Sequence, residues 1–315
     1  MTLEVRIPIS PTPTFINRTR LLAASIREFY PDALVKVYVG EHDMLMPGGF
    51  SETPAAARFD SVAWMSRRVM EEWRGTANEY AGVMAARYAP PFDGTHILML
   101  DADVIVTRRF DELFGIDALS GVQAHVPPFS LAAWSLLYQH AGLIPEWRPH
   151  EYSGYGSMFT DESARFGPPY INTGVVFGPA TRFEQLYDTY AATLRGLRLR
   201  MNSYFFEQIA LTLAAAKSKT PLHILPLRYN FPNQTAFEMR HPAELADCRF
   251  LHYLRTDTVD RDADFADQSA IQRLIYRAGL TGANEILRAR VAELRGAVGL
   301  SMPEPLSRVE DVPWA

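Results

Sequence analysis

Two aspartates separated by one residue are the part of this sequence best suited to chemistry. Asp101 and Asp103 directly follow the apolar run Ile97 to Leu100, which is typical of a buried strand, and three β-branched residues come after them. If the chain stays extended, alternate side chains point to one side, so the carboxylates share a face with their Cα atoms about 6–7 Å apart. Like charges this close repel unless a cation lies between them. The spacing therefore predicts a divalent-metal site at the carboxyl end of a central strand, where open α/β sheets bind ligands.

A histidine near the end of a later apolar strand is the candidate third ligand. His252 lies within 249–254, which we expect to form the last strand of the core. A single histidine in an apolar strand is more often a buried core residue, but a neighbouring position in the sheet can bring this one to the same metal. Carboxylates, an imidazole and phosphate oxygens together suit Mn²⁺, with Mg²⁺ as the alternative.

The composition is that of a soluble globular protein. The 315 residues are 48% hydrophobic and 21% charged, with a net charge of −5, which gives no support to nucleic-acid or anionic-membrane binding. The single cysteine, Cys248, excludes an internal disulfide and a cysteine-based zinc cluster. Because no apolar stretch resembles a signal peptide or reaches the length of a membrane span, we expect a cytoplasmic protein without a transmembrane segment.

The start of the chain predicts a right-handed βαβ unit. It consists of a strand at 3–10, a helix that is capped by Asn17 and ends near residue 30, and a strand at 34–40. The free N–H groups at the start of this helix suit a phosphate group. The residues that lead into the helix are therefore candidate nucleotide-binding residues: Ile9, Ser10 and Pro11.

The rest of the chain continues to alternate strands and helices, which favours an α/β fold with a mostly parallel sheet flanked by helices. The expected strands lie at 61–65, 97–100, 170–178, 222–225 and 249–254, and the expected helices at 78–88, 110–114, 181–194 and 203–217. The aromatic-rich stretch 121–170 is either a wall on which sugar rings stack or a small satellite core. After an acidic loop at 257–267, amphipathic helices at 270–277 and 283–298 lead into a tail. Their mixed-charge character leaves four roles open: packing on the core, a homodimer, or contact with a membrane or a partner.

Five motifs occur in the order that is found in nucleotide-sugar glycosyltransferases of the GT-A fold. They are Leu100-Asp101-Ala102-Asp103, Asn172-Thr173-Gly174-Val175-Val176, Glu207-Gln208, Leu225-Pro226 with Tyr229-Asn230, and His252-Tyr253. The chain most resembles glycosyltransferase family eight, which includes glycogenin and the bacterial lipopolysaccharide galactosyltransferases. The resemblance covers roughly residues 1–256 and rests on the order and spacing of the motifs. It implies a GT-A (Rossmann-like) catalytic domain at 1–262, with a mostly parallel mixed sheet, and a C-terminal helical extension and tail at 263–315.

The resemblance also implies roles for the matching residues. Asp101, Asp103 and His252 would bind Mn²⁺ or Mg²⁺, and the metal would hold the diphosphate of the donor. The implied catalytic residues are Glu207, Gln208 and Asn172, and the implied donor-binding residues are Ile9, Ser10, Pro11, Arg87, Asp101, Ala102, Asp103, Thr173, Gly174 and Arg255. Glu207 is the candidate base or cation stabiliser, or else simply a charge that is favoured at a helix N-terminus.

Two positions depart from the family pattern. The family histidine is followed two residues on by glycine and then by Lys-Pro-Trp, whereas His252 is followed by Tyr-Leu-Arg-Thr-Asp, so Arg255 is the candidate replacement for the lysine. The family also has a sugar-binding arginine on the helix before the aspartates. Arg87 is the only candidate for that residue, and its offset differs from the family's.

The implied activity is metal-dependent transfer of a sugar from a nucleotide-diphosphate donor, a UDP-sugar, to a hydroxyl group of a glycan, a glycolipid or a small acceptor. One alternative is a phosphatase of the haloacid-dehalogenase type with Asp101 as nucleophile. That class needs a lysine, and only Lys217 and Lys219 follow the motif. The other alternative is a non-catalytic binding protein that has the GT-A fold.

Overall fold

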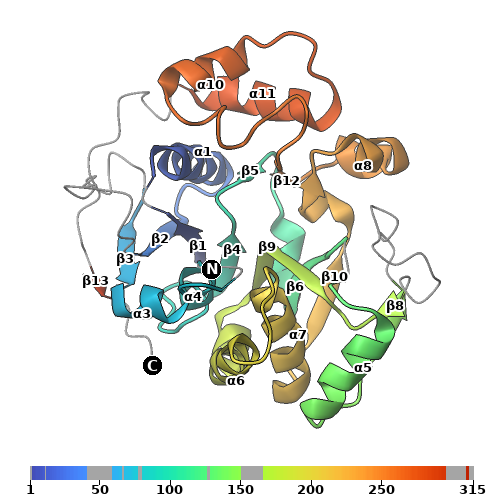
Figure 1. The fold of residues 1–315 in the computed structure, drawn as a ribbon. Helices are drawn as coiled ribbons and strands as arrows, with labels where there is room; N and C mark the ends of the chain where they lie inside the picture. The colour runs from blue at the N-terminus through green and yellow to red at the C-terminus, as the bar shows by residue number, and fades with distance from the viewer. Residues whose placement is uncertain are drawn as a thin grey trace.

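The computed structural model describes residues 2–10, 12–40, 59–65, 67–76, 80–125, 128–149, 166–295 and 310–311. They contain one eight-stranded sheet in the order β10-β6-β9-β4-β1-β2-β3-β13 (Figure 1). Its strands are β1 Leu3–Ile9, β2 Leu34–Gly40, β3 Ser61–Met65, β4 His96–Leu100, β6 Leu119–Gln123, β9 Ile171–Pro179, β10 Leu222–Leu225 and β13 Glu310–Asp311. Within this sheet β9 runs antiparallel to its neighbours β4 and β6, and the other pairs are parallel. The predicted mostly parallel mixed sheet is therefore confirmed.

Helices cover both faces of the sheet. They are α1 Pro13–Phe29, α3 Arg67–Glu72, α4 Ala81–Ala86, α5 Leu131–His140, α6 Ala180–Arg198, α7 Phe206–Ser218, α8 Thr235–Arg240, α9 Pro242–Ala246, α10 Gln268–Ile275 and α11 Gly282–Leu294, with short 3-10 turns η1 Asp111–Gly115 and η3 Leu227–Tyr229. Leu98 and Leu100 of β4 belong to one buried core with α1, α10 and α11. Ile97 and Met99 belong to a second core with α6 and α7. Because β4 has a core on each side, its apolar run is continuous instead of alternating.

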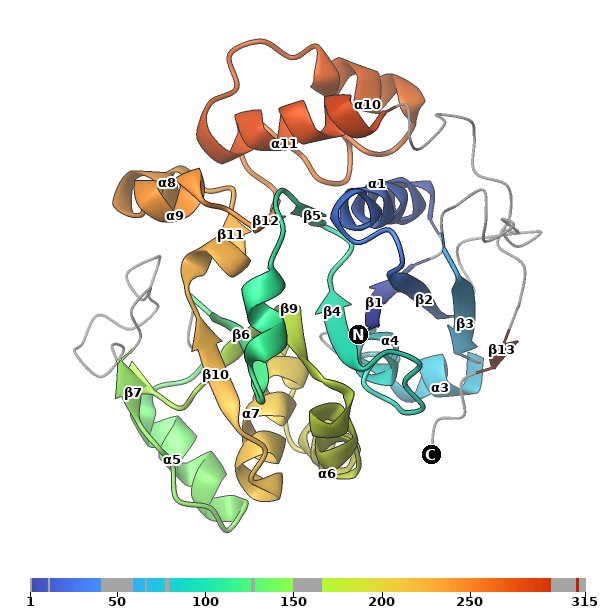
Figure 2. The same cartoon turned by 180° about the vertical axis from the view of Figure 1, so that it is seen from behind.

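A small second sheet crosses the carboxyl end of β4. It contains β5 Val104–Val106, β11 Phe231–Pro232 and β12 Phe250–His252, in the order β11-β12-β5. In Figure 2, β5 and β12 lie side by side above the end of β4. The antiparallel register places His252 opposite Val104, so the histidine is next to the aspartates.

Three local predictions need correction. The aspartates do not continue an extended strand, because the chain turns there and the amide of Val104 donates to the carbonyl of Asp101 (3.2 Å). Helix α1 begins earlier than expected, since Thr12 caps it by accepting from the Phe15 amide and a proline occupies the first turn. Asn17 instead donates to the carbonyl of Phe265 (3.0 Å), which ties α1 to the segment before α10.

The described buried aromatic residues of the stretch 121–170 do not form a separate satellite core but join the second core, next to two elements that were not predicted, β6 and α5. Trp134, Tyr138 and Tyr170 are buried and pack in the second core. The described aromatic side chains of this stretch do not line the cavity introduced below, so they form no sugar-stacking wall. Tyr152, Tyr155 and Phe159 lie outside the described residues. A two-stranded ribbon, β7 Arg148–Pro149 with β8 Phe166–Gly167, closes the unit.

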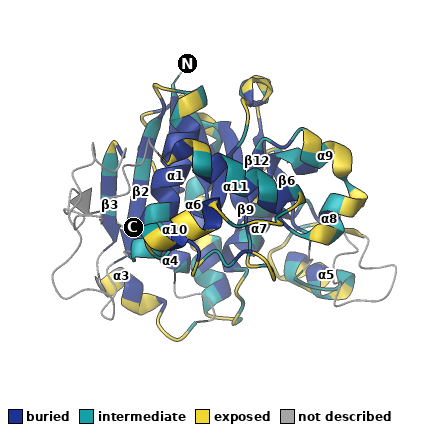
Figure 3. Ribbon diagram, turned by 90° about the horizontal axis from the view of Figure 1, so that it is seen from above, coloured by how far each residue is buried: buried dark blue, intermediate teal, exposed yellow. Residues whose placement is uncertain are grey.

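The C-terminal helices pack on the core. Leu274 of α10 and Leu287 and Val291 of α11 are fully buried in the core that α1 shares. Arg290 donates to the carbonyl of Val106 and pairs with Glu28 of α1. Figure 3 shows the central strands as buried and the outer faces of α9 and α10 as exposed. The domain boundary at residue 262 stays a prediction. None of the helices in the described residues has both the length and the apolar character needed to cross a membrane.

Candidate active site

Three elements bring the candidate metal ligands together. Asp101 follows β4, and its amide donates to the carbonyl of Gly174 in β9 (3.0 Å). The carbonyl of Asp103 accepts from the amide of Tyr253, directly after β12 (2.9 Å). Asp101, Asp103 and His252 each offer one ligand atom, and these atoms lie within 4.8 Å of one another. Two carboxylate oxygens and an imidazole nitrogen form a donor set that fits Mn²⁺ or Mg²⁺.

Asp103 is the more strongly paired carboxylate. Its Oδ1 lies 3.3 Å from Nε2 of His252, and its Oδ2 accepts a hydrogen bond from Arg261. Burial alone would raise the pKa of Asp103, but His252 and Arg261 outweigh burial and hold that pKa below its usual range. Burial lowers the pKa of His252, but the nearby Asp103 carboxylate outweighs burial and raises that pKa above its usual value. The negative charge of Asp103 is therefore available to a cation.

Asp101 is held by a buried arginine. Nη1 of Arg87 donates to Asp101 Oδ1 (2.9 Å), and Nη2 donates to the carbonyl of Thr173 (2.8 Å) and lies 3.9 Å from Glu207. Burial raises the pKa of Asp101, and Arg87 offsets only part of this increase. Arg87 ends α4 and contacts the residues after β4, in β9 and in α7, so it fixes the relative positions of these elements.

Asn230, which belongs to one of the five motifs but was assigned no role, orients the histidine. Oδ1 of Asn230 lies 3.0 Å from Nδ1 of His252, so Nδ1–H can donate to it and leave Nε2 facing the aspartates. Nδ2 of Asn230 donates to Oδ1 of Asn172 (3.0 Å), which also accepts from the Gly174 amide (2.8 Å). These contacts link β12, η3 and β9 behind the metal ligands.

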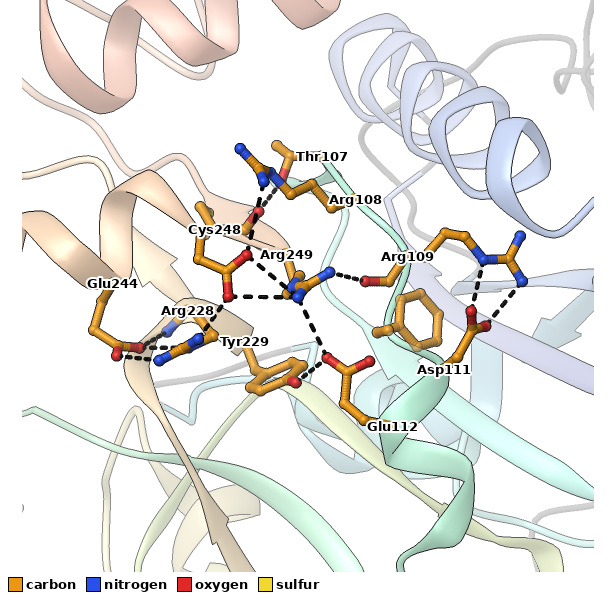
Figure 4. Close-up of polar contacts among 12 residues, drawn as sticks. Thr107, Arg108, Arg109, Asp111, Glu112, Arg228, Tyr229, Glu244, Cys248 and Arg249 are labelled. Carbon is orange, nitrogen blue, oxygen red and sulfur yellow. Dashed lines mark hydrogen bonds and ion pairs between the residues drawn. The ribbon is translucent and has the colours of Figure 1, made fainter.

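A polar network holds the segment that carries Asn230 (Figure 4). Nη2 of Arg228 donates to Glu244 (2.7 Å), and the same guanidinium pairs with Asp247. The Tyr229 hydroxyl donates to Glu112, whose carboxylate also lies 3.7 Å from Arg249. These pairs connect η3 to α9, to Arg249 directly before β12 and to η1, so they fix the backbone that carries Asn230 and leads into β12.

We expect Asn230→Ala to weaken Mn²⁺ binding about tenfold, because losing an outer-shell partner frees the imidazole of a ligand. Isothermal titration with MnCl₂ measures this affinity. Asn233→Ala is the matched control, since Asn233 is equally buried but its side chain bonds to Leu254 and Asn284 and does not contact the imidazole of His252. Equal Mn²⁺ affinities in the two variants would show that Asn230 does not orient a ligand.

The aspartates and the histidine open on a cavity of approximately 470 Å³. This volume falls in the range of small-molecule sites. The predicted site residues that line it are Ile9, Ser10, Asp101, Ala102, Asp103, Asn172, Gln208 and His252. Four other predicted site residues do not line the cavity: Arg87, Thr173, Gly174 and Glu207. Pro11 lies outside the described residues. Neither Lys217 nor Lys219 lines the cavity, so the phosphatase alternative lacks its lysine there.

Two predicted roles fit the geometry poorly. The side chain of Arg255 is 64% exposed and pairs with Asp260 and Asp262 instead of facing the cavity. Glu207 is buried beside Arg87, whereas the next residue, Gln208, lines the cavity.

The cavity also contains residues that sequence reasoning missed. Arg18 follows the start of α1 by one turn, and Arg261 lies in the acidic loop. Burial lowers the pKa of a third such residue, His125, to about 4, so this histidine is neutral at physiological pH. The prediction that the start of α1 faces a nucleotide is the only signal that pointed to any of them.

No protein-family sequence model matches the chain, and neither does any curated protein sequence. Solved structures do match it. An active-site mutant of LgtC is 13% identical, with 95% of this chain and 97% of that chain covered and a TM-score of 0.54. The galactosyltransferase LgtC in complex with donor and acceptor sugar analogues is 14% identical, with the same coverage and a TM-score of 0.53. This likeness confirms the predicted GT-A fold.

Proposed function

We propose that this protein is a metal-dependent glycosyltransferase that moves a sugar from a nucleotide-diphosphate donor, a UDP-sugar, to a hydroxyl group of a glycan, a glycolipid or a small acceptor. The observation that carries the proposal is the convergence of Asp101, Asp103 and His252 on one cavity at the carboxyl end of β4. The fold supports it, because it is shared with a galactosyltransferase that was crystallised with donor and acceptor sugar analogues.

The metal ligands and the cavity wall have separate tasks in this proposal. Asp101, Asp103 and His252 hold the divalent cation, which when bound supplies Lewis-acid neutralisation of the diphosphate leaving group. Ile9 and Ser10, at the end of β1, contact the nucleotide. Asn172 lines the place of the transferred sugar, where its orientation is fixed by Asn230 and Gly174.

Gln208 is the residue that we assign to the reacting sugar. As the glycosidic bond breaks, positive charge develops on the sugar ring, and an amide oxygen near the anomeric carbon stabilises it. Glu207 acts one layer back, because its carboxylate neutralises Arg87, which in turn holds Asp101. The cavity wall positions the acceptor hydroxyl, and this positioning supplies a large part of the rate enhancement.

A thermal-shift panel of nucleotide sugars, each with and without Mn²⁺, tests the proposal. A ligand that binds only the folded state stabilises it by about 2.7 kcal/mol at a concentration of 100 times Kd. We expect UDP-sugars with Mn²⁺ to raise the melting temperature more than either component alone, and free sugars to have no effect. Stabilisation by no nucleotide sugar, with Mn²⁺ or with Mg²⁺, would contradict the proposal.

A further inference from the structure

We propose that Arg18 and Arg261 together bind the diphosphate of the donor, and that Arg261 reaches it only after a divalent cation has displaced it from Asp103. This inference rests on the proposed function. It assigns the diphosphate contacts to residues from two distant segments, the helix after β1 and the loop after β12, in place of the exposed Arg255.

Arg18 is a buried cation, and two of its guanidinium nitrogens have no hydrogen-bond partner among the described residues. Its side chain is 2% exposed, and its Nε and Nη1 make no hydrogen bond to the described residues. The nearest carboxylate, that of Asp262, is 3.7 Å away and half exposed, and the ring of Phe15 covers one face of the guanidinium. Buried guanidinium nitrogens without hydrogen-bond partners cost stability, and a ligand anion in the adjoining cavity supplies acceptors for Nε and Nη1.

Arg261 lines the same cavity and pairs with Asp103, one of the three candidate metal ligands. Its Nη1 donates to Oδ2 of Asp103, and Oδ1 of the same carboxylate faces His252. A divalent cation between Asp101 and Asp103 cancels their negative charge and removes the attraction that holds Arg261 there. The Arg261 side chain is one-third exposed at the cavity, and among the described residues Asp103 is the carboxylate with which it forms an ion pair.

The chemistry of the two arginines selects a diphosphate in preference to a neutral sugar. Guanidinium groups bind phosphate oxygens in bidentate pairs, whereas a sugar hydroxyl does not compensate their charge. Both arginines line the same cavity as Asp103, so one anion in that cavity can contact them and the metal together. The cation and the diphosphate therefore bind cooperatively, because the cation releases Arg261 from Asp103 and the diphosphate supplies the released guanidinium with acceptors.

Opposite effects on two ligands distinguish Arg261 from an ordinary binding residue. We expect Arg261→Gln to bind Mn²⁺ alone about tenfold more tightly, and to bind UDP in the presence of Mn²⁺ about tenfold more weakly. Titration calorimetry with MnCl₂ and then UDP measures both affinities. Arg255→Gln is the matched control, because Arg255 belongs to the same loop but does not line the cavity or pair with Asp103. Unchanged Mn²⁺ affinity in Arg261→Gln would overturn the exchange at Asp103.

Arg18 is tested by its effect on the ligand-free protein. Arg18→Met keeps the volume of the side chain and removes the unsatisfied charge, so we expect a higher melting temperature without ligand and at least about tenfold weaker binding of UDP and inorganic pyrophosphate with Mn²⁺. Arg18→Lys, which keeps the charge but loses the planar fork, should recover part of this affinity. A lower melting temperature with unchanged UDP affinity would make Arg18 a structural residue.

Binding of Mn²⁺ and UDP to the wild-type protein distinguishes failure of this inference from failure of the proposed function. If it binds UDP with Mn²⁺ and the arginine variants bind equally well, the inference fails while the proposed glycosyltransferase stands. If the wild-type protein binds neither Mn²⁺ nor UDP, the proposed function fails, and the inference fails with it.

Discussion

Asp103→Asn should abolish Mn²⁺ binding and metal-dependent sugar transfer while the chain stays folded. The substitution keeps the shape of the side chain and one acceptor oxygen, but it removes the negative charge that a hard cation requires. Because Lewis-acid stabilisation of a leaving group contributes several kcal/mol, transfer should fall by about 10³-fold or more. The ligand-free variant should also melt at a lower temperature, since the charge of Asp103 balances His252 and Arg261 inside the protein.

The experiment needs binding and folding to be measured separately. Titration calorimetry with MnCl₂ gives the affinity, circular dichroism confirms that the variant is folded, and release of UDP from a UDP-sugar reports transfer. Asp117→Asn is the matched control, because Asp117 is exposed and pairs with Arg182 away from the cavity. An Asp103→Asn protein with wild-type Mn²⁺ affinity would place the metal elsewhere and remove the basis of the proposed function.

The central strand β4 could be predicted from the sequence because a strand that is buried on both faces consists of apolar residues. The apolar run Ile97–Leu100 is continuous because helices cover both sides of β4. By contrast, the composition of β6 does not identify it as a strand. It contains Gly121, where the side chain of Ile171 and the backbone of Val175 approach so closely that a Cβ atom would meet them at 3.0–3.1 Å. Close packing against β9 thus requires a residue with low strand propensity.

The turn at the aspartates could not be inferred from local pattern. Val104–Val106 has the composition of a strand, and it is one, but it leaves the main sheet and pairs with β12, about 145 residues later in the chain. Only that long-range pairing decides whether the strand continues or turns. The start of α1 is different, because Thr12 followed by Pro13 is a recognised helix-start pattern in the local sequence, whereas the prediction placed the cap at Asn17.

The candidate site was predictable where a residue type is specific for its chemistry. Two aspartates and a histidine are uncommon beside apolar strands, so their convergence could be anticipated. Arginines are not specific in this way. Arg255 and Arg261 lie in the same loop, and only the fold of that loop turns Arg261 to the cavity and Arg255 to solvent. Tertiary structure, not sequence distance, therefore decides which cation serves the site.

Gly174→Ala should disrupt the candidate metal site by displacing His252. A Cβ atom at this position in β9 would lie 2.7 Å from Cε1 of His252 and 2.8 Å from Oδ1 of Asn172. The imidazole cannot move aside freely, because it is buried and its Nδ1 is held by Asn230. We therefore expect a loss of about 1–3 kcal/mol in the free energy of unfolding from overpacking. Displacement of the ligand should weaken Mn²⁺ binding by about 100-fold.

Gly196→Ala is the control for this substitution, since a Cβ atom at Gly196 in α6 meets no atom within 4 Å. Alanine is favoured over glycine inside a helix by about 0.5–1 kcal/mol, so this variant should be slightly more stable and bind Mn²⁺ normally. Urea unfolding and titration with MnCl₂ measure the two effects. If Gly174→Ala lost stability but kept wild-type Mn²⁺ affinity, the imidazole of His252 could not be a ligand in its present position, and the metal would depend on the two aspartates alone.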